Sequence, residues 1–183
     1  MGSSPSKGGG EEWTSEIYFD PRADGNDTPA RISDDELKTK FKELIDPSEK
    51  ILNVRVYKTP LSEVQLTNAV SFHAYTVFET DQWWWSIEKN TEGLTVQRAK
   101  DFDAVGKRYR QTKRPGIDFV QFGMQLIKED EGRKTMDELV DFLYRKDKLN
   151  QKYNWATSNC KNLAADIFNF VARYKNWNHI GIF

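Results

Sequence analysis

The sequence predicts an α+β domain in which a small antiparallel sheet packs on helices. From Ile51 onward apolar and polar residues alternate, which is the period of a strand with one covered face. Two aromatic runs, Val70–Phe78 and Trp83–Asn90, follow as candidates for an antiparallel hairpin. After Asn159 the apolar residues recur at the spacing of an amphipathic helix.

Length and composition fit one compact domain. The chain has 183 residues, of which 38% are hydrophobic and 13% are aromatic, enough to build one buried core. We expect a flexible arm rich in glycine and serine over residues 1–28, followed by a single domain over residues 29–183.

Charge and cysteine content exclude several classes of protein. A net charge of −1 gives no overall reason to expect a nucleic-acid partner. The single cysteine excludes an internal disulfide bond and cysteine-rich zinc sites, and it indicates a reducing compartment. No apolar run reaches the roughly 18 residues of a membrane span, and no metal-ligand cluster or glycine-rich phosphate loop is present. We therefore expect a cytoplasmic protein that uses no metal or cofactor.

The first six residues allow one membrane contact. Met1–Ser6 matches the pattern for N-myristoylation on Gly2, although a leader of this kind can also remain from recombinant expression. A single myristoyl chain binds membranes only marginally. The sequence therefore predicts at most a peripheral membrane contact.

Two capping boxes predict the starts of two helices. Ser33–Glu36 opens one helix, which ends at Pro47, and Thr135–Glu138 opens the other. The residues expected to face the core are Leu37, Phe41, Leu44 and Ile45 in the first helix, and Met136, Leu139, Val140 and Leu143 in the second.

Further strands are expected between these helices. The strand from Ile51 should end at Pro60, and Gly93–Arg98 and Phe119–Ile127 are candidates for others. In the first of these strands Leu52, Val54 and Val56 should be covered. The basic run Lys107–Arg114 is expected to be a solvated loop; the alternative is a patch for phosphate, lipid head groups or RNA.

Cys160 lies where a thiol could be reactive. The helix stripe runs through Leu163, Ala164, Ile167, Phe168, Phe170, Val171 and Tyr174, so Cys160 falls in the first turn. There the unpaired N–H groups and the positive end of the helix dipole favour a thiolate and lower its pKa. The alternation of Tyr153, Trp155 and Thr157 predicts a short extended segment before the helix.

His73 is the better candidate for a base, because His179 lies in a terminal segment whose orientation is hard to fix. A tight turn about Thr80–Asp81 would place His73 opposite Glu88, with Tyr75 and Trp84 on the same side of the hairpin. Glu88 could then accept a hydrogen bond from one imidazole nitrogen and leave the other facing Cys160.

A slip of two residues in this hairpin would bring Asn90 into the place of Glu88, and a slip of one would turn the second strand over. The other side of the hairpin is mainly apolar and should be buried against a helix. Its residues are Ala74, Thr76, Phe78, Trp83, Trp85 and Ile87.

The order of these elements resembles the permuted papain-like fold. It is similar to lecithin:retinol acyltransferase-like proteins and to PPPDE peptidases, which belong with the NlpC-type cysteine peptidases. The local match is the tyrosine-led segment Tyr153–Cys160, which ends in Asn-Cys, together with a histidine on a distant strand. The resemblance implies attack on an amide, ester or thioester carbonyl of an acyl, peptide or lipid substrate.

By this resemblance Cys160 is the nucleophile, His73 the base and Glu88 the orienting residue. The backbone N–H of Cys160 would be one oxyanion donor, and Tyr75 or Asn159 would shape the pocket. An exposed ring of the tryptophan run, Trp84, could hold the acyl or peptide substrate.

Two other hypotheses stay open at this point. The acyltransferase-like proteins carry a second histidine on the neighbouring strand, where this chain offers Glu88 or Asn90, and an acidic-His pair after the cysteine, where it has Lys161–Asn162. A catalytically silent binding module on the same fold is therefore the first alternative. The second is a membrane- or RNA-associated adaptor that uses Gly2 and the run Lys107–Arg114.

Overall fold

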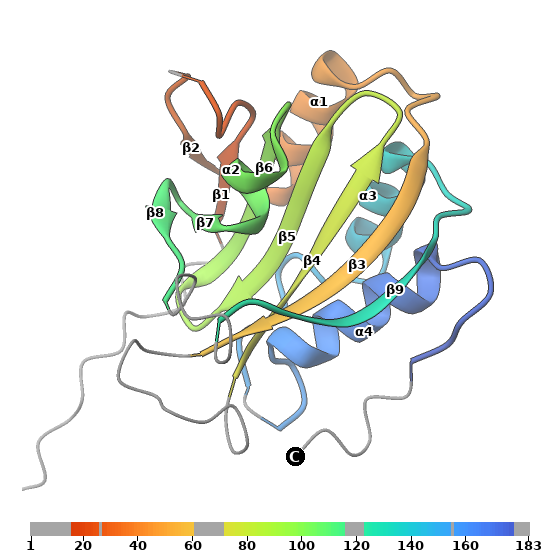
Figure 1. Cartoon of the computed structure of the whole chain (residues 1–183). Coiled ribbons are helices and arrows are strands. Elements are labelled where there is room, and N and C mark those ends of the chain that lie inside the picture. The colour runs from red at the N-terminus through yellow and green to blue at the C-terminus, as the bar shows by residue number, and fades with distance from the viewer. Residues whose placement is uncertain (1–15, 26, 61–71, 116–122, 155, 178–183) are drawn as a thin grey trace, which may run out of the picture.

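The computed structural model describes residues 16–25, 27–60, 72–115, 123–154 and 156–177 (Figure 1). Over these ranges the chain has an α+β fold with one seven-stranded sheet, a separate two-stranded ribbon and four helices. The strands are β1 (Ile17–Asp20), β2 (Ala30–Ile32), β3 (Ile51–Thr59), β4 (His73–Thr80), β5 (Trp84–Asn90), β6 (Gly93–Ala99), β7 (Arg108–Tyr109), β8 (Thr112–Lys113) and β9 (Gln125–Glu131). The helices are α1 (Asp34–Leu44), α2 (Phe102–Gly106), α3 (Met136–Arg145) and α4 (Cys160–Val171).

The main sheet has the strand order β2-β1-β6-β5-β4-β3-β9. Its pairs are antiparallel except that of β1 with β6, which is parallel. The sheet is therefore larger than the small antiparallel sheet expected from the sequence. Residues 17–20, expected to belong to the arm, form β1 between β2 and β6, so the sheet takes in part of that segment.

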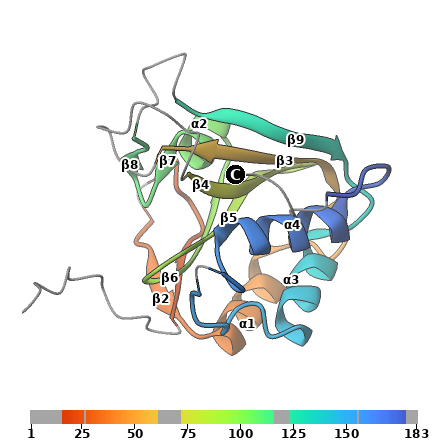
Figure 2. The ribbon, with the colours of Figure 1, turned by 90° about the horizontal axis from the view of Figure 1, so that it is seen from below.

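Helices cover the two faces of the sheet unequally. Figure 2 shows α1, α3 and α4 on one face, and α2 with the β7–β8 ribbon on the other. The main core lies on the three-helix face, where Ala74, Phe78, Trp85 and Ile87 are buried as expected. A smaller core lies under α2 and contains Tyr75 and Val77.

Both predicted capping boxes are present. Ser33 and Glu36 bond reciprocally at the start of α1, and Thr135 and Glu138 do so at the start of α3. In α1 the residues Leu37, Phe41 and Ile45 are buried, but Leu44 is exposed, so the expectation for Leu44 was wrong. The residues of α3 expected to face the core are all buried.

Two other residues expected to be covered are exposed. Leu52 turns outward because the pairing of β3 with β4 shifts between Ile51 and Asn53, which puts Ile51 inside instead. Tyr174 is exposed because α4 ends at Val171 and the chain then turns to β9, where the Arg173 N–H donates to the Glu131 carbonyl.

The expected extended segment before α4 is a turn instead. Asn154 and Ser158 exchange both backbone hydrogen bonds, and the Asn154 side-chain oxygen accepts from the N–H groups of Ala156 and Thr157. An asparagine that bonds the backbone two and three residues ahead favours a turn over a strand. Of the expected strand Phe119–Ile127, residues 119–122 lie outside the described residues, and β9 covers the end of it.

The β4–β5 hairpin has a different register from the one predicted. Glu88 lies opposite Tyr75, not opposite His73, and Trp84 lies opposite Glu79. The turn closes later than expected because the Thr80 hydroxyl accepts from the Trp83 N–H at 2.7 Å. The same hydroxyl donates to the buried Glu49 at 2.6 Å, a contact between distant parts of the chain that fixes the turn. A slip of two keeps every side chain on its predicted face.

Candidate active site

His73 and Glu88 are bonded at one end of the sheet. His73 is the first residue of β4, and its Nε2 lies 2.7 Å from Oε2 of Glu88 on β5. The His73 side chain is 12% exposed, whereas that of Glu88 is completely buried. Because the carboxylate is bound to Nε2, the Nδ1 nitrogen is left for a different partner.

Cys160 is a second hydrogen-bond partner of His73 and reaches it from the other face of the sheet. Cys160 is the first residue of α4, and α4 packs against β3, β4 and β5. The pairing of β4 with β5 stops at Tyr75, so the first two residues of β4, His73 and Ala74, have no partner on β5 and are open to α4. The Cys160 thiol bonds to His73, and its sulfur also accepts from the backbone N–H of Ala74.

The interactions favour a thiolate–imidazolium pair. Burial alone would raise the pKa of Cys160, but the hydrogen bond to His73 and its charge outweigh this and lower it. Burial alone would lower the pKa of His73, but hydrogen bonds to Cys160 and Glu88 raise it to about 9. Both shifts act in the same direction, toward a proton on the imidazole and an anionic sulfur.

Glu88 is held as a carboxylate by Arg114. Burial alone would raise the pKa of Glu88, but the charge of Arg114 and the hydrogen bonds from His73 and Arg114 lower it to about 2. Arg114 donates from both terminal nitrogens, at 3.0 Å to Oε2 and 2.6 Å to Oε1 of Glu88. A buried two-pronged pair of this kind fixes both carboxylate oxygens.

Tyr75 supports the site and does not line an open surface. Its ring lies parallel to the His73 ring, with centroids 6.2 Å apart and planes 10° apart. Its hydroxyl donates to the Gly106 carbonyl at 2.7 Å, and the Arg114 guanidinium lies 3.7 Å from its ring centroid. Burial raises the pKa of Tyr75, so the phenol stays protonated.

A pocket of about 310 Å³ opens beside the two bonded residues. We call it the histidine pocket; its lining includes Thr59, His73, Glu88, Asn90, Tyr109 and Arg114. Asn90 is thus near His73 as the alternative register suggested, but the carboxylate that bonds the imidazole belongs to Glu88. Hydroxyl, amide and charged side chains line it together with apolar surface, which makes up the larger part.

Two other predicted site residues, Asn159 and Trp84, make contacts of a different kind. Asn159 caps α4, and its side-chain oxygen accepts from the N–H groups of Lys161 and Asn162. Trp84 lies at the far end of β5, where its ring meets Phe102 edge-on with centroids 5.2 Å apart. Gly2 and His179 lie outside the described residues.

Sequence reasoning missed the buried cations Arg114, Lys89 and Arg98. The sequence predicts a solvated basic loop for Arg114, but its side chain is 2% exposed. Lys89 is also buried, and its Nζ donates at 2.7 Å to the Ser158 hydroxyl in the turn before α4. Burial lowers the pKa of Lys89 to about 8. One sequence signal could have indicated the burial of Lys89: the charged pair Glu88-Lys89 lies within an aromatic, β-prone strand.

The rest of the basic run is also mostly paired. Lys107 bonds Asp103 at 2.7 Å, and Arg110 bonds Glu92 at 2.7 Å. Residues 108–113 form the β7–β8 ribbon, not an irregular loop, and its tip residues Arg110 and Gln111 have positive φ angles of 48° and 67°.

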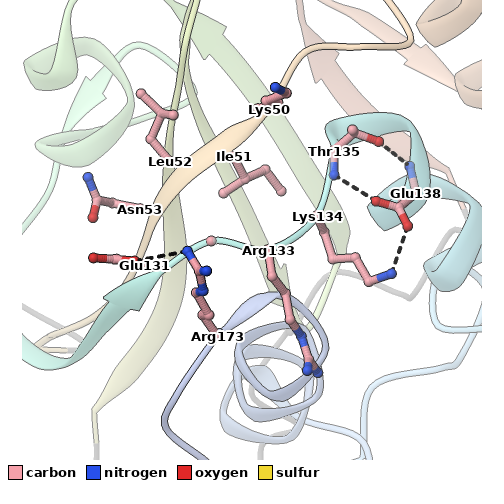
Figure 3. A pocket seen from close by; sticks show the side chains of 11 residues that line it. Lys50, Ile51, Leu52, Asn53, Glu131, Arg133, Lys134, Thr135, Glu138 and Arg173 are labelled. Carbon is pink, nitrogen blue, oxygen red and sulfur yellow. Dashed lines mark hydrogen bonds and ion pairs between the residues drawn. The ribbon is translucent and has the colours of Figure 1, made fainter.

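A larger pocket, of about 570 Å³, lies away from this chemistry (Figure 3). It is formed by residues 50–53 and 131–135 with Glu138 and Arg173, so it lies at the opposite end of β3 from Thr59, the partner of His73. Eight residues of strand separate the two ends, about 26 Å at roughly 3.3 Å per residue. Its carboxylates are occupied, since Glu138 bonds Lys134 at 2.7 Å and Glu131 bonds Arg173 at 3.5 Å.

Within the described ranges, no cluster of three or more His, Cys, Asp and Glu side chains could hold a metal ion. The same ranges contain no helix that is long and apolar enough to cross a membrane. Comparisons with protein-family models, curated proteins and solved structures found no match to this chain.

Proposed function

We propose that this protein is a cysteine-dependent hydrolase or acyltransferase on a permuted papain-like fold. The observation that carries the proposal is the bonded series Cys160–His73–Glu88, with the thiol at the start of α4. A nucleophile, a base and a group that orients the base are the three parts that such chemistry requires.

The reaction begins with the proton of the Cys160 thiol on His73. The thiolate attacks the carbonyl carbon of an amide, ester or thioester, a C–S bond forms, and the carbonyl oxygen becomes an oxyanion. When the oxyanion collapses, the bond to the leaving group breaks and His73 returns its proton to that group. Water or a second acceptor then gives a proton to His73, attacks the thioester, and releases the Cys160 thiolate.

Two features of the start of α4 support the oxyanion. The Cys160 N–H is the first amide of the helix, and such amides have no partner within the helix itself. The helix dipole adds positive potential at the same place. We assign the Cys160 N–H as one donor to the oxyanion. The capping oxygen of Asn159 occupies the next two N–H groups, so these are not assigned to that role.

The histidine pocket is the place proposed for part of the substrate. Its lining combines hydrogen-bonding side chains with a larger apolar surface, so it suits a group that has both a polar end and an apolar body.

Alkylation of the single cysteine tests the proposal. Iodoacetamide should label Cys160 of the native protein at pH 7 faster than it labels N-acetylcysteine amide, because the thiolate is populated. His73→Ala should slow the labelling about tenfold or more, as the thiol returns toward its ordinary pKa. His179→Ala, which changes the other histidine of the chain, is the matched control and should label at the wild-type rate. The proposal would be contradicted if the wild-type protein were labelled no faster than the model thiol and His73→Ala had no effect on the rate.

A catalytically silent binding module is the second candidate. It is favoured by the low exposure of Cys160, at 6%, which restricts access to the sulfur. Binding of peptides or acyl amides to the protein, without turnover and without formation of a thioester detectable by intact mass, would favour this alternative over the enzyme.

A further inference from the structure

Arg114 connects the candidate site to the β7–β8 ribbon. It follows β8 directly, and its backbone N–H donates to the Lys107 carbonyl at 3.0 Å, which closes the ribbon. Its side chain then enters the interior, where Nε donates to the Gly106 carbonyl at 3.0 Å. The two terminal nitrogens bond the two oxygens of Glu88.

We propose that Arg114 is a positioning residue of the site, which keeps the buried Glu88 carboxylate charged and directed at His73. The inference rests on the proposed function for its role in catalysis, but the effect on Glu88 can be measured without any activity.

The geometry explains why Glu88 needs this partner. A buried carboxylate without a compensating charge takes up a proton, and it then stops being an anionic acceptor for the imidazole. Oε2 of Glu88 contacts both His73 and Arg114, while Oε1 contacts Arg114 alone. The rigid fork of a guanidinium can hold both oxygens at once, which leaves Oε2 directed at His73. A lysine ammonium is a single point of charge and cannot reproduce this arrangement.

The other charged groups around Glu88 do not supply the same compensation. The groups that face it are His73, the phenols of Tyr75 and Tyr109, and Arg114. Both phenols have a raised pKa, so they are neutral over the working range. Arg110 bonds Glu92 at 2.7 Å and is occupied there. Arg114 is therefore the permanent charge on which the Glu88 carboxylate depends.

Arg110 provides a matched control, because it lies on the same ribbon and also pairs with a carboxylate. Arg114→Met keeps much of the side chain that packs on Tyr75 but removes the charge, and Arg110→Met makes the same change away from Glu88. If Arg114 had only a structural role, Arg114→Met would lower the melting temperature, as Arg110→Met would. The titration of Glu88 would then be unchanged in both variants.

The decisive experiment follows the Glu88 carboxyl carbon by ¹³C NMR between pH 3.5 and 8. In the wild type we expect no titration step of Glu88 in this range, because its pKa is about 2. Arg114→Met should bring a step above about pH 4.5, and Arg114→Lys should bring one between about pH 3.5 and 4.5. Arg110→Met should behave as the wild type. If Arg114→Met does not fold, Arg114→Lys decides the question.

Labelling of Cys160 supplies the link to catalysis. Arg114→Met should move the acid limb of the pH profile for iodoacetamide to higher pH by about one unit, or about tenfold in rate at a fixed acidic pH. Glu88→Gln should give a similar shift, and the double variant should be no worse than either single one. A folded Arg114→Met or Arg114→Lys variant in which Glu88 still shows no step above pH 3.5 overturns the inference. An unreactive Cys160 in the wild type would count against the proposed function alone. The titration of Glu88 is measured by NMR independently of this labelling, so it would still test the role of Arg114.

Discussion

His73 and Glu88 are hydrogen-bonded although they are not opposite each other in the hairpin that joins them. Their side-chain atoms Nε2 and Oε2 lie 2.7 Å apart, while the ladder partner of Glu88 is Tyr75. Diagonal neighbours on one face of a sheet are within reach of long side chains. The contact therefore depends on His73 and Glu88 sharing a face, and it survives a shift of the register by two.

Replacing Glu88 with glutamine should destabilise the protein at neutral pH and have little effect at acidic pH. The pKa of Glu88 is lowered from 4.5 to about 2, so its contribution to stability is complete above pH 4.5 and is lost as the pH falls toward 2. A shift of this size corresponds to about 3 kcal/mol. The free energy of unfolding in urea, measured for both proteins at pH 7, 5 and 3, checks the prediction.

Glu92→Gln is the control, since Glu92 also pairs with an arginine but its side chain is partly exposed. Its effect should be within about 1 kcal/mol, as for partly exposed ion pairs. A gap between wild type and Glu88→Gln that stays constant from pH 7 to 3 would contradict a low pKa of Glu88.

The faces of the strands could be predicted from the sequence, but the register could not. Alternation placed His73, Tyr75 and Glu88 on one side, and the apolar residues on the other, as the structure has them. The register depends on Thr80, whose hydroxyl is fixed by Glu49 from a distant part of the chain. A contact between residues 31 positions apart leaves no local pattern to read.

Arg114 shows a second limit of sequence reasoning. Within a run of basic residues before Pro115, a solvated arginine is the ordinary expectation. What makes Arg114 different is the ribbon that turns it inward toward Glu88 and Gly106, and this depends on the position of α2. The helix starts, in contrast, are set by local capping residues, and both predicted capping boxes are present.

His73→Gln should reduce stability most at mildly acidic pH. The pKa of His73 is raised from 6.5 to about 9, so its contribution is complete below pH 6.5 and is lost as the pH rises through 9. The difference in unfolding free energy between wild type and variant should fall by about 3 kcal/mol from pH 6 to pH 10. Urea unfolding at several pH values measures it.

The same comparison in a Cys160→Ala background removes the titration of the thiol. The decline should then be smaller, because one of the two hydrogen bonds that raise the pKa of His73 is gone, while the bond from Glu88 remains. A difference that grows with pH in either background would show that His73 is not stabilised in its charged form.

Asn159→Ala should destabilise the protein by about 1 kcal/mol, because the side chain of Asn159 is the N-cap of α4. Asn159→Asp keeps an oxygen that can accept from Lys161 and Asn162 and should be close to wild type. Thermal unfolding of the three proteins distinguishes capping from other roles. An aspartate variant as unstable as the alanine variant would show that the cap is not what Asn159 contributes.

Gly132→Ala should be among the more damaging small substitutions, because Gly132 lies against the backbone of β3. A Cβ atom at this position would lie 2.2 Å from the carbonyl oxygen and 2.8 Å from the carbonyl carbon of Ile51. The strand backbone cannot move away without breaking its pairing with β4, so we expect a loss of about 2 kcal/mol or more. In Gly25→Ala the nearest contact is 3.4 Å, to the side chain of Arg22, and this variant should remain within about 0.5 kcal/mol of wild type. Urea unfolding of both variants at pH 7 measures the difference, and equal stabilities would mean that β3 and the residue after β9 are not held as closely as described.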